Sequence, residues 1–263
     1  MSKPAVIIVG ADKGGVGKTT ITRTLLDYFN ARKIPIRAFD TESPKGTLKR
    51  FHPDLTEVVD VTKIPDQMHI FDTISDSAVT IIDVRAGLMS PTLAALRDIG
   101  FLDAAKKGQI VFAVFHILGP SIASLSEIAE TSKLLTDARY FLVKNFINNT
   151  SFFDWDQATY NSYFNRVPHA YEIAIPRLNE MANEQVELAS VPFINFIANK
   201  GATGENAQNS FVLRGYVRHW LGNVWAEYDR VKLADIADMK ESVSKPEPLK
   251  PQPPRVMKVA EAS

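Results

Sequence analysis

The sequence predicts an α/β domain with a mostly parallel central sheet and helices on both of its faces. Short apolar runs alternate with longer segments of helical periodicity along most of the chain, as in sheets that helices cover on both sides. A glycine-rich loop also stands between the first apolar run and the first helical segment, an arrangement typical of parallel sheets that bind anions. With 263 residues, of which 45% are hydrophobic, the chain can bury the core of one such domain.

The individual elements follow from their periodicity. A run of consecutive apolar residues predicts a strand buried on both faces, and the candidates are Ala5–Val9, Ile36–Phe39, Val79–Val84, Ile110–Phe115, Tyr140–Val143, Glu172–Ile175 and Phe193–Ile197. Apolar residues that recur every three or four positions predict a helix, and the candidates are Thr19–Arg32, Thr92–Ala105, Ile122–Leu135, Leu178–Ala189 and Phe211–Val231. We expect Thr56–Ser77 to hold short strands and turns, and Phe152–Phe164 to form either a helix or a surface insertion.

The last predicted helix is the most clearly amphipathic one. We expect it to pack on the sheet through an apolar stripe made of Val217, Leu221, Val224, Tyr228 and Val231. The composition then changes to Lys-Pro and Pro-Pro pairs, as in Lys250-Pro251-Gln252-Pro253-Pro254. The sequence therefore predicts one domain over residues 1–239 and a Pro-rich, extended and disordered tail over residues 240–263. A passive terminus is the favoured interpretation of this tail, and a partner-docking segment is the alternative.

Composition excludes several classes of function. The net charge is +0, so no overall basic field attracts nucleic acid, and any DNA contact must come from a local patch. The chain has 0 cysteines, which excludes disulfides, thiolate catalysis and iron–sulfur ligation. We see neither a signal peptide nor an apolar run approaching the ~20 residues that span a bilayer. We therefore expect a cytoplasmic protein without membrane insertion, associated with the nucleoid if it binds DNA.

The most informative motif is the glycine-rich loop, which reads Lys13-Gly14-Gly15-Val16-Gly17-Lys18-Thr19-Thr20. Glycines allow backbone N–H groups to turn inward around phosphate oxygens. Lys18 is placed to reach the terminal phosphates, and the Thr19 hydroxyl is placed to hold Mg²⁺. Because a buried strand precedes the loop and a helix N-terminus follows it, the segment predicts a nucleotide site of the P-loop type.

Two aspartates end predicted strands near this loop in the expected sheet. Asp83 follows the apolar run Val79-Thr80-Ile81-Ile82, the Walker B form. A carboxylate at the carboxyl edge of a parallel strand lies at the crevice where ligands bind and can hold Mg²⁺ through water. Asp40 ends the second predicted strand, and one interpretation of it is a strand-end cap.

The box Lys-Gly-Gly-x-Gly-Lys-Thr-Thr resembles the deviant Walker A motif of the ParA/MinD family of ATPases, because Lys13 stands ahead of the paired glycines. In that family this signature lysine crosses a dimer interface and contacts the nucleotide held by the other subunit. The resemblance is to the short ParA-like partition and positioning ATPases. It implies a single P-loop NTPase domain with ATP and Mg²⁺ as cofactors, a homodimer with ATP sandwiched, and catalytic roles for Lys13 and Lys18.

The segment after the second strand departs from the family pattern. ParA-like proteins usually carry Asp-x-Asp-Pro-Gln-Gly there, where the first Asp lies close to Mg²⁺ and the second helps to place the attacking water. Asp40 fits the first position, Glu42 replaces the second Asp, and Ser43 looks like an insertion before Pro44. Water placement is sensitive to about 1 Å, so we expect slow hydrolysis or a differently placed group. A solvated loop acid is the alternative for Glu42.

Two later strand ends resemble the base-recognition segments of relatives. Leu142-Val143-Lys144-Asn145 resembles the strand whose terminal Asn reads adenine, since an amide offers both a donor and an acceptor. Ile173-Ala174-Ile175-Pro176 resembles the strand whose following loop lies against the base. A plain strand-end turn is the alternative for each. The sequence has no Asn-Lys-x-Asp motif for guanine, which favours ATP over GTP.

The resemblance implies a ParA-type switch in which ATP closes a dimer, the dimer binds DNA nonspecifically, and a partner protein stimulates hydrolysis to ADP and phosphate. Its role would be to position or segregate DNA or a protein cargo. The candidate DNA contacts are Arg214, Arg218, Lys200 and Arg230. One alternative is a MinD-like, membrane-associated regulator of cell division, although the Pro-rich tail does not supply the amphipathic helix that membrane binding needs. The other is an ATP-dependent carboxylate–amine ligase of the same superfamily, against which Lys13 argues.

Overall fold

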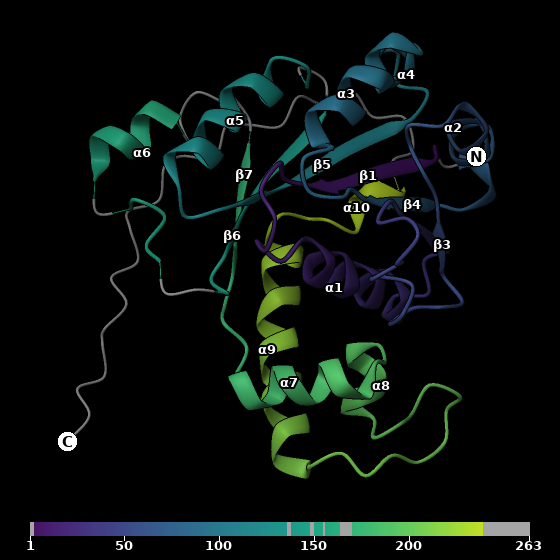
Figure 1. Cartoon of the computed structure of the whole chain (residues 1–263), viewed down its shortest axis with the longest axis vertical. Helices are drawn as coiled ribbons and strands as arrows, with labels where there is room; N and C mark the ends of the chain where they lie inside the picture. The colour runs from purple at the N-terminus through teal and green to yellow at the C-terminus, as the bar shows by residue number, and fades with distance from the viewer. Residues whose placement is uncertain (1–2, 136–137, 148–149, 155, 164–169, 239–263) are drawn as a thin grey trace.

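The protein is built on one seven-stranded sheet in which every strand pair is parallel (Figure 1). The computed structural model describes residues 3–135, 138–147, 150–154, 156–163 and 170–238. The strand order is β3-β2-β4-β1-β5-β6-β7. The strands are β1 (Ala5–Gly10), β2 (Ile36–Asp40), β3 (Thr56–Val58), β4 (Val79–Asp83), β5 (Val111–Leu118), β6 (Arg139–Asn145) and β7 (Tyr171–Ile175). This confirms the predicted class, an α/β domain with a parallel central sheet.

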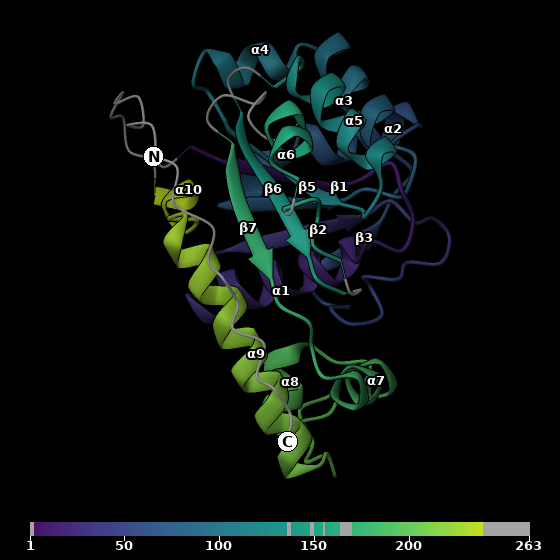
Figure 2. The same ribbon diagram turned by 90° about the vertical axis from the view of Figure 1, so that its left-hand side faces the viewer.

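Helices cover both faces of the sheet (Figure 2). One layer holds α1 (Lys18–Ala31), α7 (Glu180–Ala189), α8 (Phe193–Ile197), α9 (Phe211–Arg230) and α10 (Asp235–Asp238). The other holds α2 (Ile64–Phe71), α3 (Met89–Asp98), α4 (Phe101–Lys106), α5 (Ile122–Ser132) and α6 (Gln157–Tyr163). A 3₁₀ turn, η1 (Ile74–Asp76), precedes β4. In the part of the chain that the structure describes, no helix is long and apolar enough to cross a membrane.

The central strands are apolar throughout because both faces are covered. In β1, Ala5, Ile7 and Val9 face the core under α1 and α9, whereas Val6 and Ile8 face the core under α3 and α5. These five side chains are fully buried. Alternate residues of one strand therefore serve two cores, so the run shows no polar alternation.

The predicted amphipathic stripe of α9 is confirmed. Val217, Leu221, Val224 and Tyr228 are buried in the core that α1 and the sheet also line, and Val231, just past the helix end, is buried with them. Thr56–Ser77 holds β3, α2 and η1, so the expected short strand and turns are joined by a helix. Phe152–Phe164 contains α6, which favours the helical alternative over its described residues.

Three element predictions are corrected. Phe193–Ile197, predicted as a strand, is helix α8. A short apolar run is compatible with either element, and here Phe193 and Phe196 stand three residues apart and are both buried, as on one side of a helix. The predicted helix Thr92–Ala105 is two helices, because Gly100 adopts a left-handed backbone (φ 78°) between α3 and α4. The helix predicted from Leu178 begins at Glu180, where Asn179 caps its first turn. The predicted tail, 240–263, lies outside the described residues.

Candidate functional site

The phosphate loop joins the end of β1 to the start of α1. Gly15 (φ 73°) and Gly17 (φ 90°) adopt left-handed backbone conformations, which a residue with a side chain rarely accepts. Gly17 is the residue that caps α1, and it has no side chain with which to bond the first amides of the helix. Those amides and the positive end of the helix dipole therefore form a cradle for an anion.

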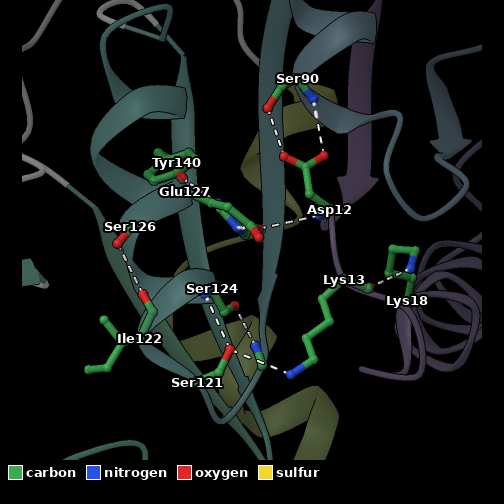
Figure 3. A network of polar contacts seen from close by, with 12 residues as sticks. Asp12, Lys13, Lys18, Ser90, Ser121, Ile122, Ser124, Ser126, Glu127 and Tyr140 are labelled. Atoms are coloured by element: carbon green, nitrogen blue, oxygen red, sulfur yellow. Dashed lines mark hydrogen bonds and ion pairs between the residues drawn. The ribbon is translucent and has the colours of Figure 1, made fainter.

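Lys18 lies across its own loop. Its Nζ donates to the backbone carbonyl of Lys13 at 3.2 Å (Figure 3). Burial lowers the pKa of Lys18, and the nearby carboxylates of Asp83 and Glu42 oppose that effect. The ammonium group thus sits among acids, and a phosphate group in the cradle would take the place of the Lys13 carbonyl as its partner.

Lys13 extends in a different direction. Its Nζ lies 3.5 Å from the Oγ of Ser121, the residue that caps α5 (Figure 3). The two lysines of the loop therefore do not converge on one point. Lys18 bonds its own loop, whereas the ammonium of Lys13 lies beside helix α5.

The predicted metal residues meet at the loop. Asp83 ends β4 and is buried, and burial followed by the adjacent charge of Asp40 raises the pKa of its carboxyl to about 7. Hydrogen bonds from the Thr19 and Thr22 side chains oppose that rise. A hydroxyl and a buried acid beside a phosphate cradle fit Mg²⁺, which takes oxygen ligands and keeps several waters and phosphate oxygens. Within the described residues there is no group of three or more His, Cys, Asp or Glu that could hold a metal ion.

Asp40 organises the loop that follows β2. It stands directly opposite Asp83 in the β2–β4 ladder. Its Oδ1 accepts from the amide of Glu42 (2.9 Å) and its Oδ2 accepts from that of Leu48 (2.7 Å). The capping alternative is therefore realised, while a direct part in the metal shell stays a prediction. Glu42 in turn accepts a hydrogen bond from the Thr47 hydroxyl, and its role in placing water also stays a prediction.

Asn145 supports the phosphate loop from β6. Its Nδ2 donates to the carbonyl of Val16 at 3.0 Å, and the residue is buried. A Cβ on Gly17 would lie 2.2 Å from the same nitrogen, so position 17 requires glycine for space as well as for its backbone angle. The sequence suggested adenine recognition for Asn145, which remains a prediction; the loop support was not predicted.

A small cavity of about 130 Å³ adjoins the loop. It is lined by Lys13, Gly14, Gly15, Val16, Leu118, Pro120, Asn145, Ile147 and Thr150. Pro176 is not part of this lining. Its carbonyl instead accepts from the indole Nε1 of Trp220 at 2.7 Å, which fastens the end of β7 to α9.

The predicted DNA contacts do not form one patch. Arg214 is half-buried and donates to the carbonyl of Ile197. Arg230 lies near the other end of α9, roughly 24 Å away along the helix axis, and pairs with Glu227. Lys200 is bonded to Asn206 and Arg218 is exposed. Arg218 therefore offers the most open charge of the four.

The structure adds polar residues around the loop that sequence reasoning missed (Figure 3). Asp12 accepts from Ser90 at the start of α3, and its amide donates to Glu127 of α5. Glu127 also lies 3.6 Å from the Nε2 of His116, whose Nδ1 bonds the Tyr140 hydroxyl. Asp12 directly precedes the motif, and a charged residue beside Lys13 was the available signal.

No family model and no curated protein matches the sequence. Among solved structures, the chain is similar to the septum site-determining protein MinD of Pyrococcus horikoshii in complex with Mg-ADP, at 14% identity over 89% of this chain and 98% of that one, with a TM-score of 0.56. It is also similar to a ParA family ATPase of Chlorobium tepidum, at 14% identity over 83% of this chain and 98% of that one, with a TM-score of 0.49. MinD of Aquifex aeolicus matches at 15% identity over 83% and 97%, with a TM-score of 0.46.

The likeness to the Pyrococcus protein shows that this chain has the fold of that MinD protein. It confirms the resemblance indicated by the loop motif at the level of the fold. The predicted nucleotide-site residues Lys18, Thr19 and Asp83 come together at the carboxyl edge of this fold, where parallel sheets bind their ligands.

Proposed function

We propose that the chain is a ParA-type switch ATPase that binds ATP and Mg²⁺, dimerises around the nucleotide and hydrolyses ATP to ADP and phosphate. The observation that carries the proposal is the divergence of the two loop lysines. Lys18 bonds its own loop at the Lys13 carbonyl, whereas Lys13 extends to Ser121, away from that carbonyl. A second cation outside its own cradle is suited to the nucleotide of a facing subunit.

Each residue then has a role of its own. The α1 amides and Lys18 bind and neutralise the phosphates. Thr19 and Asp83 hold Mg²⁺, which supplies positive charge to the terminal phosphates when bound. Glu42 orients water, and Asp40 holds the Glu42 backbone in place through its 2.9 Å hydrogen bond. Lys13 offsets the charge of the nucleotide in the facing subunit.

The switch would position or segregate a cargo, either DNA or a protein assembly, with hydrolysis stimulated by a partner protein. Arg218 and Arg214, one turn apart on α9, are the candidate DNA contacts. A charged surface of this kind would bind the phosphate backbone without reading sequence.

Light scattering with and without ATP and Mg²⁺ tests the proposal, combined with retention of duplex DNA at two salt concentrations. We expect a doubling of mass with ATP, and DNA retention that needs ATP and weakens steeply with salt. A protein that stays monomeric at saturating ATP would contradict the dimeric switch. Dimers that form with ATP but do not retain DNA would favour a protein assembly over DNA as the cargo.

A MinD-like role is the second candidate, because the Pyrococcus structure with the same fold is a septum site-determining protein. Sedimentation with vesicles of phosphatidylglycerol and phosphatidylethanolamine separates the two roles. ATP-dependent pelleting with these vesicles, without DNA retention, would favour the MinD-like role. Product formation from a carboxylate and an amine by a monomer would indicate the ligase alternative.

A further inference from the structure

Asp12 ties the phosphate loop to helices on the sheet face opposite α1. Its Oδ2 accepts from the Oγ of Ser90 at 2.8 Å, and its Oδ1 lies 3.4 Å from the Ser90 amide (Figure 3). Its own amide donates to the Oε2 of Glu127 at 3.4 Å. One residue of the loop thus contacts the first turn of α3 through its side chain and α5 through its backbone.

The start of α3 also packs directly on the loop. A Cβ on Gly10 would lie 3.0 Å from both Cγ and Sδ of Met89, so this helix turn is in close contact with the end of β1. A Cβ on Gly14 would lie 3.8 Å from that of Ala86. The chain from Asp83 to α3 therefore runs along the phosphate loop over residues 84–90.

This segment is held at defined points. The amide of Val84 donates to the carbonyl of Val9 at 2.8 Å, and the amide of Arg85 donates to the Thr41 hydroxyl at 2.8 Å. The next hydrogen bond along the segment joins Ser90 to Asp12, and it reaches the phosphate loop through a charged side chain. Between Arg85 and Ser90, Gly87 is exposed and has a left-handed backbone (φ 79°).

A carboxylate at position 12 opposes phosphate binding at the loop, and its contacts point to another role. Counted back from Gly17, the ordinary pattern Gly-x-x-x-x-Gly-Lys-Thr places its first glycine at position 12, where this chain has Asp. The charge of Asp12 acts on Lys18, since it is one of the carboxylates that favour the protonated ammonium. An anion that close to the site of incoming phosphates disfavours their binding through repulsion.

We infer that Asp12 is a positioning residue that couples the phosphate loop to α3, so that the third phosphate changes the order of residues 84–98. The inference rests on the proposed binding of ATP at this loop. Added negative charge in the cradle acts on Lys18 and on Asp12 together. The Asp12 carboxylate passes a displacement of the loop to Ser90, and Ser90 carries it into α3.

Hydrogen exchange of residues 84–98 tests this inference, with ADP and with the non-hydrolysable analogue AMP-PNP, both in Mg²⁺. In the parent, we expect slower exchange with AMP-PNP than with ADP. In Ser90→Ala, we expect that difference to fall by about tenfold, the scale of one hydrogen bond to a charged group. Calorimetry should give an ADP affinity within about twofold of the parent, because Ser90 lies outside the cradle.

Further variants separate coupling from a general loss of structure. Ser90→Thr keeps the hydroxyl and should restore the difference. Asp12→Asn keeps a hydrogen-bond acceptor without the charge and should retain part of the exchange difference between AMP-PNP and ADP. The double variant D12N/S90A should lose no more of that difference than S90A alone. Ser126→Ala is the matched control, because Ser126 is exposed on α5 and bonds only the Ile122 carbonyl among the described contacts.

The outcomes distinguish this inference from the proposed function. Parental exchange behaviour in Ser90→Ala, or failure of Ser90→Thr to restore it, overturns the coupling while nucleotide binding stands. A parent that binds both nucleotides with identical exchange over 84–98 also overturns the coupling alone. A parent that binds neither nucleotide in calorimetry overturns the proposed function and this inference with it.

Discussion

Under the proposed function, Lys18 is the residue on which we expect nucleotide affinity to depend most directly. Its side chain already lies over the loop, bonded to the Lys13 carbonyl, and several acids surround it. Those acids would repel phosphates if the ammonium group were removed. Lys18→Ala should therefore bind ATP at least about a hundredfold more weakly, since a charged hydrogen bond and its neutralising charge are lost together.

Calorimetry with ATP and Mg²⁺ measures this change. The matched control is Lys107→Ala, because Lys107 is exposed just after α4, outside the cavity beside the phosphate loop. Unchanged affinity in Lys18→Ala would show that the cradle is not the nucleotide site.

A second group of charges lies buried on α1, away from the loop. Asp27 is fully buried and accepts from the amide of Ile194 at 3.3 Å. His52 is 4.0 Å from it, and the buried guanidinium of Arg23 is a further charge on the same helix. Burial raises the pKa of Asp27 to about 7 and, together with Arg23, lowers the pKa of His52 to about 3.

These shifts set a pH dependence of stability. A carboxyl whose pKa is raised by folding stabilises the fold most below its unfolded pKa of 3.8, and this contribution is lost as the pH rises through about 7. Asn stays neutral at every pH, so the melting temperature of Asp27→Asn relative to that of the parent should be higher at pH 8 than at pH 5. The stabilising contribution of His52 has the opposite pH dependence, because it is lost as the pH falls from 6.5 toward 3. Parent and variant both contain His52, so its contribution largely cancels when their melting temperatures are compared.

Thermal melts of parent and Asp27→Asn at pH 5 and pH 8 check this prediction. Asp54→Asn serves as the control, because Asp54 is exposed and its difference from the parent should be the same at both values. A difference between Asp27→Asn and the parent that does not change with pH would contradict a neutral, buried Asp27.

At the scale of elements, β6 supports the phosphate loop through Asn145. The hydrogen bond from its amide to the Val16 carbonyl crosses from one strand end to the loop of another. Asn145→Ala should lower the free energy of unfolding by about 1–3 kcal/mol, because a buried carbonyl loses its donor. ATP affinity should fall as well, since the loop loses its support.

Denaturant unfolding without nucleotide measures the first effect, and calorimetry measures the second. Asn183→Ala is the control, because Asn183 is exposed on α7. If Asn145→Ala lost ATP affinity but kept full stability, Asn145 would act on the base and not on the loop.

The central strands were predictable because their apolar runs have few alternative explanations. β1, β2 and β4 lie close to their predicted bounds, since the three strands end at Gly10, Asp40 and Asp83, which interrupt the apolar runs. The run Phe193–Ile197 was predicted wrongly because five apolar-rich residues fit a strand or a helix, and only its packing under α9 decides between them. The break at Gly100 depends on a single left-handed residue, which the helical periodicity around it conceals.

The placement of the candidate site residues was predictable where a motif fixes their order in the sequence. Lys18, Thr19 and Asp83 meet at one sheet edge because parallel strands end there. The contacts of Asp12 with Ser90 and of Asn145 with Val16 join segments far apart in the chain, and no local pattern encodes such pairs. Pro176 lies outside the lining of the cavity and its carbonyl is bonded to Trp220, and its place against the base stays a prediction.

At the scale of the whole molecule, the two layers of helices meet the same loop from opposite sides. α1 begins in the loop itself, while α3 and α5 contact it through Asp12. Lys13 extends from this junction to the cap of α5. The ammonium of Lys13 therefore lies beside α5 and apart from that of Lys18, which bonds the loop itself.

Lys13→Ala should keep ATP binding and lose ATP-driven dimerisation. Lys18 already serves the phosphates within one subunit, so affinity for one nucleotide should change little. Two facing triphosphates repel each other, and a lysine from each subunit would offset that repulsion in a two-fold symmetric dimer. Light scattering with AMP-PNP and Mg²⁺ should show a dimer for the parent and for Lys107→Ala, and a monomer for Lys13→Ala at the same concentration. ATP turnover should fall with dimerisation, since the crossing charge also stabilises phosphoryl transfer. If Lys13→Ala dimerised as the parent does, or if the parent stayed monomeric at saturating nucleotide, ATP would not be sandwiched between subunits and Lys13 would act within its own chain.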